Sequence, residues 1–153
     1  MTQLTQHFAL DEFTRSQTAT RHGIDNTPPG SAQINLARLA EKLEAIRAAC
    51  GNRSVQITSG YRSPAVNARI GGSRTSAHME GRAADIVVRG MTAVQVARAI
   101  ERAGIVLDQL IYEGTWVHVG IPRVGEVSRG NVLTAIFEPG KPVRYTHGIV
   151  AAA

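Results

Sequence analysis

The chain has 153 residues, of which 43% are hydrophobic and 19% are charged, and this composition excludes a mostly disordered protein. No apolar run reaches the ~18 residues of a membrane-spanning helix, so we expect no membrane insertion. The single cysteine, Cys50, excludes an internal disulfide framework and a cysteine-rich zinc module. This length predicts one domain over residues 1–153.

The charge balance is basic, with 17 Lys and Arg against 12 Asp and Glu and a net charge of +5. A basic surface favours polyanionic partners such as nucleic acid, anionic lipid or cell wall. The positive residues are scattered and form no long run, so we expect no nucleic-acid partner and interpret most of them as solubility charges. The first residues contain no basic stretch followed by an apolar one, which predicts no signal peptide and synthesis in the cytoplasm.

The first half of the sequence predicts helices. Residues 8–22 form the first, and Ser31 caps a second, long helix that ends at Gly51. Residues 55–58 alternate as a short strand does, and a turn then leads into a short helix at residues 64–70.

Strands dominate the second half. They are expected at residues 83–88, 108–112 and 116–120, with a helix capped by Thr92 after the first of them. The last segment, 122–153, contains a hairpin, while residues 8–121 form the domain core. The expected class is therefore α+β, with helices packed on a small, largely antiparallel sheet.

Three polar residues stand out in apolar surroundings or next to them. Asp85 lies within an apolar strand and His118 lies between two valines, while His78 follows a glycine-rich loop that can fold back over the strand. A buried carboxylate needs a partner, and two imidazoles with one carboxylate suit Zn²⁺ with a fourth position open. The simpler interpretation pairs Asp85 with Arg82 or Arg62 and leaves the histidines as hydrogen-bonded core residues.

A family resemblance adds to this interpretation. The sequence resembles the zinc D-Ala-D-Ala carboxypeptidases and the related phage endolysin peptidases, most closely their short single-domain branch, over residues 8–121. The residues that carry the resemblance are Ser76-x-His78-x-x-Gly81-x-Ala83-x-Asp85, Trp116-Val117-His118-Val119, Ile57-Thr58-Ser59-Gly60-Tyr61-Arg62-Ser63, Asn67 and Gly71-Gly72. The resemblance implies a Hedgehog/DD-peptidase-like fold.

It also implies roles for individual residues. His78, Asp85 and His118 would bind one zinc ion per chain, and Arg62 would hold a substrate carboxylate or carbonyl. Ser76 and Tyr61 would line the same cleft as substrate-binding residues, although a turn cap and a core aromatic are equally good interpretations of this pair.

The general base departs from the pattern that the resemblance implies. Many relatives place an acid three residues before the last zinc histidine. Thr115 occupies that position here, and the nearest acid is Glu113. We therefore predict Glu113 as the catalytic base, with Asp108 as the reserve and Glu80 as a poorer candidate. An exposed turn acid is the alternative interpretation of Glu113.

The implied function is zinc-dependent hydrolysis of peptide bonds in peptidoglycan stem peptides, by a monomer that acts on the cell wall after release or as part of a phage particle. A carboxypeptidase and an endopeptidase both fit. The alternative function, which Thr115 favours, is a catalytically weak or inactive zinc-binding structural or cell-wall-binding module of a phage particle.

Overall fold

The computed structural model describes residues 2–151 and begins with two short helices, α1 (Leu10–Thr14) and α2 (Gln17–His22). The prediction of one helix over residues 8–22 is wrong, because the backbone is extended at Arg15 and Ser16. The Ser16 side chain accepts a hydrogen bond from the Ala19 amide (3.1 Å) and so caps α2 as a separate helix.

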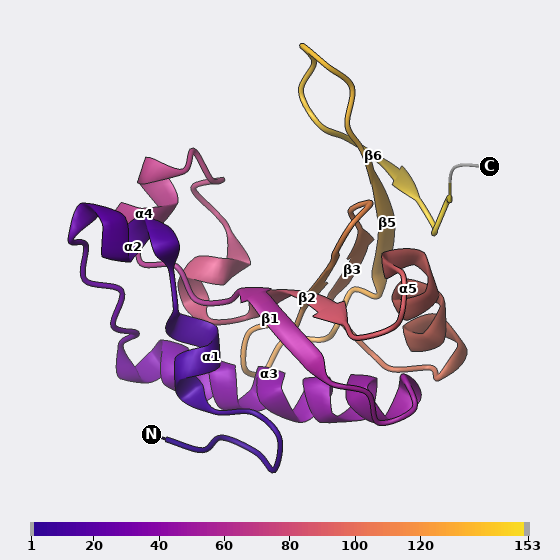
Figure 1. Ribbon diagram of the computed structural model, residues 1–153, viewed down its shortest axis with the longest axis horizontal. Coiled ribbons are helices and arrows are strands. Elements are labelled where there is room, and N and C mark those ends of the chain that lie inside the picture. The colour runs from indigo at the N-terminus through magenta and orange to yellow at the C-terminus, as the bar shows by residue number, and fades with distance from the viewer. Residues whose placement is uncertain (1, 152–153) are drawn as a thin grey trace.

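Four more helical segments follow. They are α3 (Gly30–Ala49), α4 (Pro64–Arg69), the 3₁₀ helix η1 (Ala77–Glu80) and α5 (Ala93–Arg102). The long α3 lies beneath the sheet and buries Leu36, Leu39, Leu43 and Ile46 at helical spacing (Figure 1). The predicted cap of α5 is confirmed, since the Thr92 hydroxyl accepts a hydrogen bond from the amide of Gln95. None of the helices within residues 2–151 has the length and hydropathy needed to cross a membrane.

Six strands form one sheet. They are β1 (Val55–Ser59), β2 (Ala83–Val88), β3 (Gln109–Tyr112), β4 (Val117–Gly120), β5 (Asn131–Ile136) and β6 (Arg144–His147), in the order β1-β2-β4-β3-β5-β6. Among the described strands every pairing is antiparallel except that of β3 with β5. The predicted α+β class is confirmed, and the β5–β6 pair forms the expected C-terminal hairpin.

The two faces of the sheet differ in what they contact. Alternate residues of β2, β3 and β4 join α3 and α5 in one hydrophobic core, including Ala84, Ile86, Leu110, Val117 and Val119. The residues between them point to the opposite face, because side chains alternate along a strand. The opposite face therefore carries the polar groups of the strands.

A row of paired residues crosses this opposite face. Asp85 on β2 pairs with His118 on β4, and His118 pairs with Ile111 on β3. Ile111 in turn pairs with Leu133 on β5. The sheet thus places the Asp85 and His118 side chains beside each other on a surface that continues toward the C-terminal hairpin.

Candidate active site

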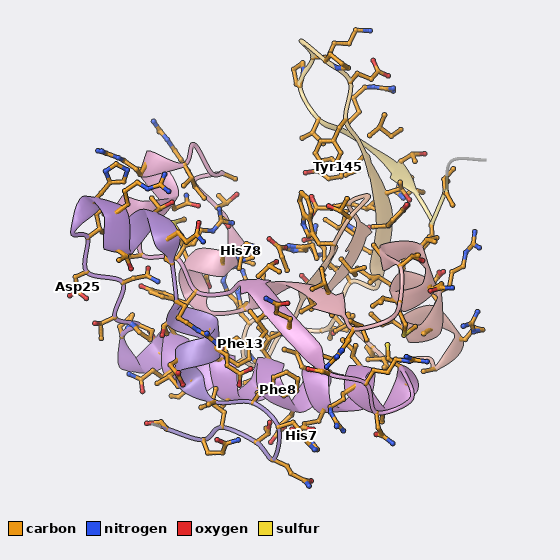
Figure 2. All side chains as sticks on the ribbon, in the orientation of Figure 1. His7, Phe8, Phe13, Asp25, His78 and Tyr145 are labelled. Carbon is orange, nitrogen blue, oxygen red and sulfur yellow. The ribbon has the colours of Figure 1, made fainter. Side chains whose placement is uncertain are left out.

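The three predicted metal ligands come together on the open face of the sheet. His78 Nε2 lies 3.6 Å from Asp85 Oδ1, and His118 Nδ1 lies 3.1 Å from the same oxygen. One candidate ligand atom from each of the three residues lies within 4.8 Å of the other two. The strands supply Asp85 and His118, and η1 supplies His78 from above (Figure 2).

Hydrogen bonding fixes the orientation of His78, whose exposed fraction is only 3%. Its Nδ1 lies 2.8 Å from the Gly60 carbonyl, so Nδ1 must carry the proton and donate it. Nε2 then turns its lone pair toward Asp85. Burial lowers the pKa of His78, which favours the neutral imidazole that a metal requires.

Asp85 supplies the negative charge of this cluster. Burial raises the pKa of its carboxyl, but the contacts with His118 and His78 outweigh burial and hold the pKa below its usual range. Arg82, the alternative partner, instead donates to Glu80 and to the Ile121 carbonyl. Two imidazoles and an ionised carboxylate fit Zn²⁺ as three ligands with a fourth position open.

A cleft of about 910 Å³ lies over this cluster. One wall is the segment from Arg62 to His78, and the other includes Arg129, Leu133 and Tyr145. His78, Asp85 and His118 all belong to the lining of this cleft.

Arg62 and Ser76 are in the cleft, as the sequence predicts. The Arg62 Nη2 donates to the Ser76 hydroxyl (3.3 Å), which also accepts from the His78 amide (3.3 Å). Burial lowers the pKa of Arg62, whereas the charges of Asp85 and Glu113 act in the opposite direction. The guanidinium therefore remains a cation facing two acids across the cleft.

Glu113 lies in the turn between β3 and β4 and lines the same cleft. Its amide donates to the Trp116 carbonyl (3.0 Å), and its carboxylate accepts from the Trp116 indole (2.8 Å). Burial raises the pKa of Glu113, and the charge of Asp85 raises it further. The turn thus brings the Glu113 carboxylate into the cleft.

The other two candidate bases are engaged in ion pairs. Hydrogen bonds from Arg129 lower the pKa of Asp108, and those from Arg123 and then Arg82 lower the pKa of Glu80 to about 2. Of the three predicted acids, only Glu113 combines a raised pKa with a place beside the triad.

Comparison with known proteins agrees with this geometry. Residues 6–120 match the family described as Peptidase M15. The chain belongs to the peptidase M15 family. It is also 32% identical over 74 residues to a zinc D-Ala-D-Ala carboxypeptidase of Streptomyces albus G, a match that covers 48% of this chain and 29% of that protein. The family and this relative imply Zn²⁺ as the cofactor, and the His-Asp-His cluster is a site that could hold it.

Tyr61 lies elsewhere in this M15 peptidase. The residue is 3% exposed and belongs to the hydrophobic core rather than to the cleft lining. The Tyr61 amide donates to the Phe13 carbonyl (2.7 Å), which fixes the backbone just before Arg62. The structure thus favours the core interpretation of Tyr61, which the sequence left open.

Sequence analysis missed three contributors to the site. The Gly60 carbonyl orients His78, the Trp116 indole holds Glu113, and Tyr145 lines the cleft from the hairpin. The three-residue spacing of Glu113 and Trp116 across a tight turn was a usable signal for the hydrogen bond between the Trp116 indole and Glu113. The place of Tyr145 depends on the parallel β3–β5 pair, for which the sequence offers no local signal.

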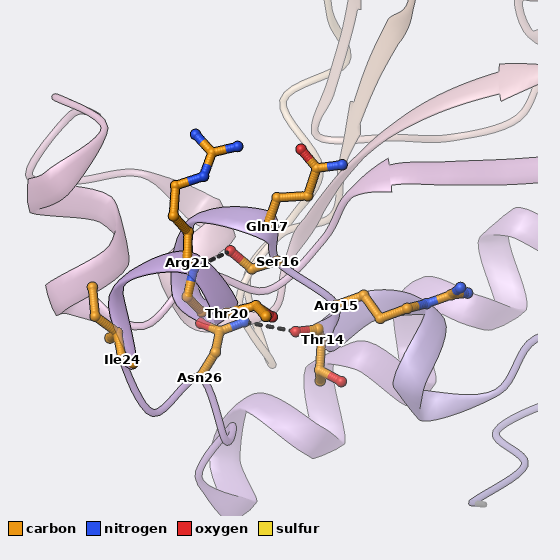
Figure 3. Close-up of a pocket in the computed structure, with 10 residues that line it drawn as sticks. Thr14, Arg15, Ser16, Gln17, Thr20, Arg21, Ile24 and Asn26 are labelled. Carbon is orange, nitrogen blue, oxygen red and sulfur yellow. Dashed lines mark hydrogen bonds between the residues drawn. The ribbon is translucent and has the colours of Figure 1, made fainter.

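A second hollow of about 930 Å³ lies along α2 and the loop after it (Figure 3). Asn26 in its lining donates to the Thr14 carbonyl (2.9 Å) and accepts from the Ser63 amide (2.7 Å). None of the predicted site residues lines this hollow. Its polar contacts therefore brace the segment that follows Arg62.

Proposed function

We propose that this chain is a zinc-dependent peptidase that hydrolyses peptide bonds in peptidoglycan stem peptides, with His78, Asp85 and His118 as the metal ligands. The observation that carries the proposal is the convergence of these three donors on the floor of a cleft in a chain of the peptidase M15 family. The name of the Streptomyces relative supports a D-Ala-containing substrate.

The residues around the triad then have distinct tasks. Zn²⁺, when bound, acts as a Lewis acid for the scissile carbonyl and acidifies water. Glu113 takes the proton of the attacking water and returns it to the leaving amine. Arg62 binds a substrate carboxylate or carbonyl through a planar pair of donors.

The biological setting is part of the proposal. We infer an endolysin, or a wall-degrading protein of a phage particle, that is made in the cytoplasm, reaches the wall after release and acts as a monomer. The net charge of +5 supports attraction to an anionic wall. It adds nothing about which bond is cut.

A second function keeps one specific observation in its favour. The family resemblance implies an acid three residues before His118, and Thr115 stands at that position in this chain. A protein that binds zinc and cell wall without turnover is therefore the competing candidate.

The test combines metal analysis of the purified protein with turbidity loss of permeabilised cells, with and without a chelator. We expect about one zinc per chain and chelator-sensitive lysis. Zinc without lysis supports the binding module, whereas protein that holds no zinc after purification without chelators overturns the ligand assignment.

The variant Glu113→Gln tests the role of Glu113 as general base separately from metal binding. We expect it to keep its zinc and lose roughly 10²- to 10⁴-fold in turnover. The matched control is Glu126→Gln, which removes another acid of the cleft lining and should leave turnover unchanged.

A further inference from the structure

The β5–β6 hairpin lies beyond residues 6–120, the part of the chain that matches the family. It projects from the sheet on the side away from α4, and Tyr145 is directed toward the space between them (Figures 1 and 2). Its large residues Phe137 and Tyr145 are 57% and 51% exposed. The hairpin thus adds exposed aromatic surface to the family core.

Strand register places Tyr145 and Glu113 on either side of β5, near Ala135. On β6, Tyr145 pairs with Ala135 of β5. The parallel β3–β5 pairing ends with Tyr112 opposite Thr134, so Glu113 is one position further on, beside Ala135. Ala135, which lies between them, has only a methyl side chain and is 8% exposed, so neighbouring side chains cover it.

Three further features agree with this placement. Tyr145 and Glu113 line the same cleft. Burial raises the pKa of the Tyr145 hydroxyl, and the Glu113 carboxylate raises it further, which requires the two groups to be near each other. Phe137, two positions beyond Ala135, packs against Trp116 with ring centroids 6.2 Å apart. The hairpin wall is therefore anchored to the turn that holds Glu113.

Arg62 and Tyr145 lie on opposite sides of the triad. Arg62 follows β1 at one edge of the sheet, and Tyr145 belongs to β6 at the other edge. Asp85 and His118 are on the strands between them. A peptide that crosses the ligand atoms with its carboxyl end at Arg62 must therefore extend its amino-terminal arm toward Tyr145.

We propose that Tyr145 is a substrate-binding residue of the cleft, whose ring packs against the amino-terminal arm of the stem peptide while Arg62 holds the opposite arm. The inference rests on the proposed function and deepens it. A phenol ring suits this arm, because peptide planes and methyl groups pack on its face. Within residues 2–151 the Tyr145 hydroxyl makes no hydrogen bond and the residue is 51% exposed, so the hydroxyl and part of the ring are accessible to a ligand.

The test uses the zinc-loaded protein and two synthetic ligands. One is the stem pentapeptide L-Ala-γ-D-Glu-L-Lys-D-Ala-D-Ala, and the other is N-acetyl-D-Ala-D-Ala, which lacks the amino-terminal arm. The chain has one tryptophan, Trp116, and it lines the cleft, so its fluorescence reports binding without requiring turnover. Cleavage is measured on the same samples.

We expect Tyr145→Ala to weaken pentapeptide binding by about three- to tenfold and to leave binding of the short ligand unchanged. Tyr145→Phe keeps the ring and should bind both ligands as the parent protein does. Arg144→Ala is the matched control, because its side chain points to the other face of β6 and lies outside the cleft lining. Tyr145→Gln repeats the test should the alanine variant be unstable.

Equal binding of the pentapeptide by Tyr145→Ala and the parent protein overturns the inference, and so does an equal loss for both ligands. Binding that depends on Tyr145 without cleavage supports the inference and contradicts the proposed function. Cleavage that is indifferent to Tyr145 contradicts the inference alone.

Discussion

Arg62 keeps most of its donors free for a substrate. Among the described residues its side chain donates only to the Ser76 hydroxyl, and its buried Nε has no partner. An unpartnered buried donor is costly, so a ligand that accepts from it gains affinity. We expect Arg62→Lys to raise KM by roughly ten- to a hundredfold, because lysine cannot form the planar pair of hydrogen bonds. Steady-state kinetics on stem peptides measure this, and an unchanged KM contradicts the role.

Gly60 controls His78 through its backbone. A Cβ at this position would lie 2.5 Å from the Phe13 carbonyl oxygen, which is backbone and cannot move aside cheaply. We expect Gly60→Ala to cost about 1–3 kcal/mol of stability and to weaken zinc binding by displacing the carbonyl that orients His78. Calorimetry and a zinc titration measure the two effects. Gly30→Ala, where a Cβ meets nothing within 4 Å, is the control and should leave zinc binding intact.

The segment between β4 and β5 is held by ion pairs that belong to the cleft rim. Arg123 donates to both oxygens of Glu80 (2.9 Å each), which also accepts from the buried Arg82. The folded-state pKa of Glu80 is depressed from 4.5 to about 2, so its contribution is complete above pH 4.5 and is lost as the pH falls toward 2. Solvent screens this contribution because the side chain is 37% exposed, which leaves about 1 kcal/mol.

The corresponding variant is Glu80→Gln. It should lose about 1 kcal/mol of unfolding free energy at pH 7 and show a smaller further loss between pH 4.5 and pH 2 than the parent protein. Denaturant unfolding at several pH values measures the difference. Parallel pH curves for the two proteins would show that the Glu80 ion pairs contribute nothing to folding.

Some elements with local signals were predicted well, but Ser31 does not cap α3, which begins at Gly30 after Pro29. The strand at residues 83–88 has the bounds given by its apolar run, and Thr92 caps α5 as expected. The single helix over residues 8–22 was wrong, because Ser16 caps α2 as a separate helix by accepting a hydrogen bond from the Ala19 amide. Ser16 was therefore a local capping signal that the prediction of one helix did not use.

At the scale of the whole sheet, the sequence indicated the triad and its neighbours Arg62, Ser76 and Glu113, but not the cleft residues that β5 and the hairpin supply. His78, Asp85 and His118 lie in motifs that are recognisable one by one, and antiparallel pairing of β2 with β4 brings two of them together. The parallel β3–β5 pair joins segments separated by β4 and the 121–130 loop, so no local pattern shows that Leu133 and Tyr145 reach the cleft. Non-local pairing is therefore what sequence analysis could not supply.

Zinc should stabilise the molecule as a whole, because its proposed ligands join η1, β2 and β4. A metal that binds only the folded state adds about 4 kcal/mol at a free concentration 1,000 times Kd. For a chain of this size that corresponds to a rise in Tm on the order of 10 °C.

We expect Asp85→Asn to abolish most of this zinc-dependent rise, since the variant loses the charged ligand. The exposed His147 on β6 provides the control His147→Ala, which should keep the full rise. Scanning calorimetry with and without a chelator compares the shifts rather than the absolute Tm values. An equal shift in both variants would place the zinc outside the His78–Asp85–His118 cluster.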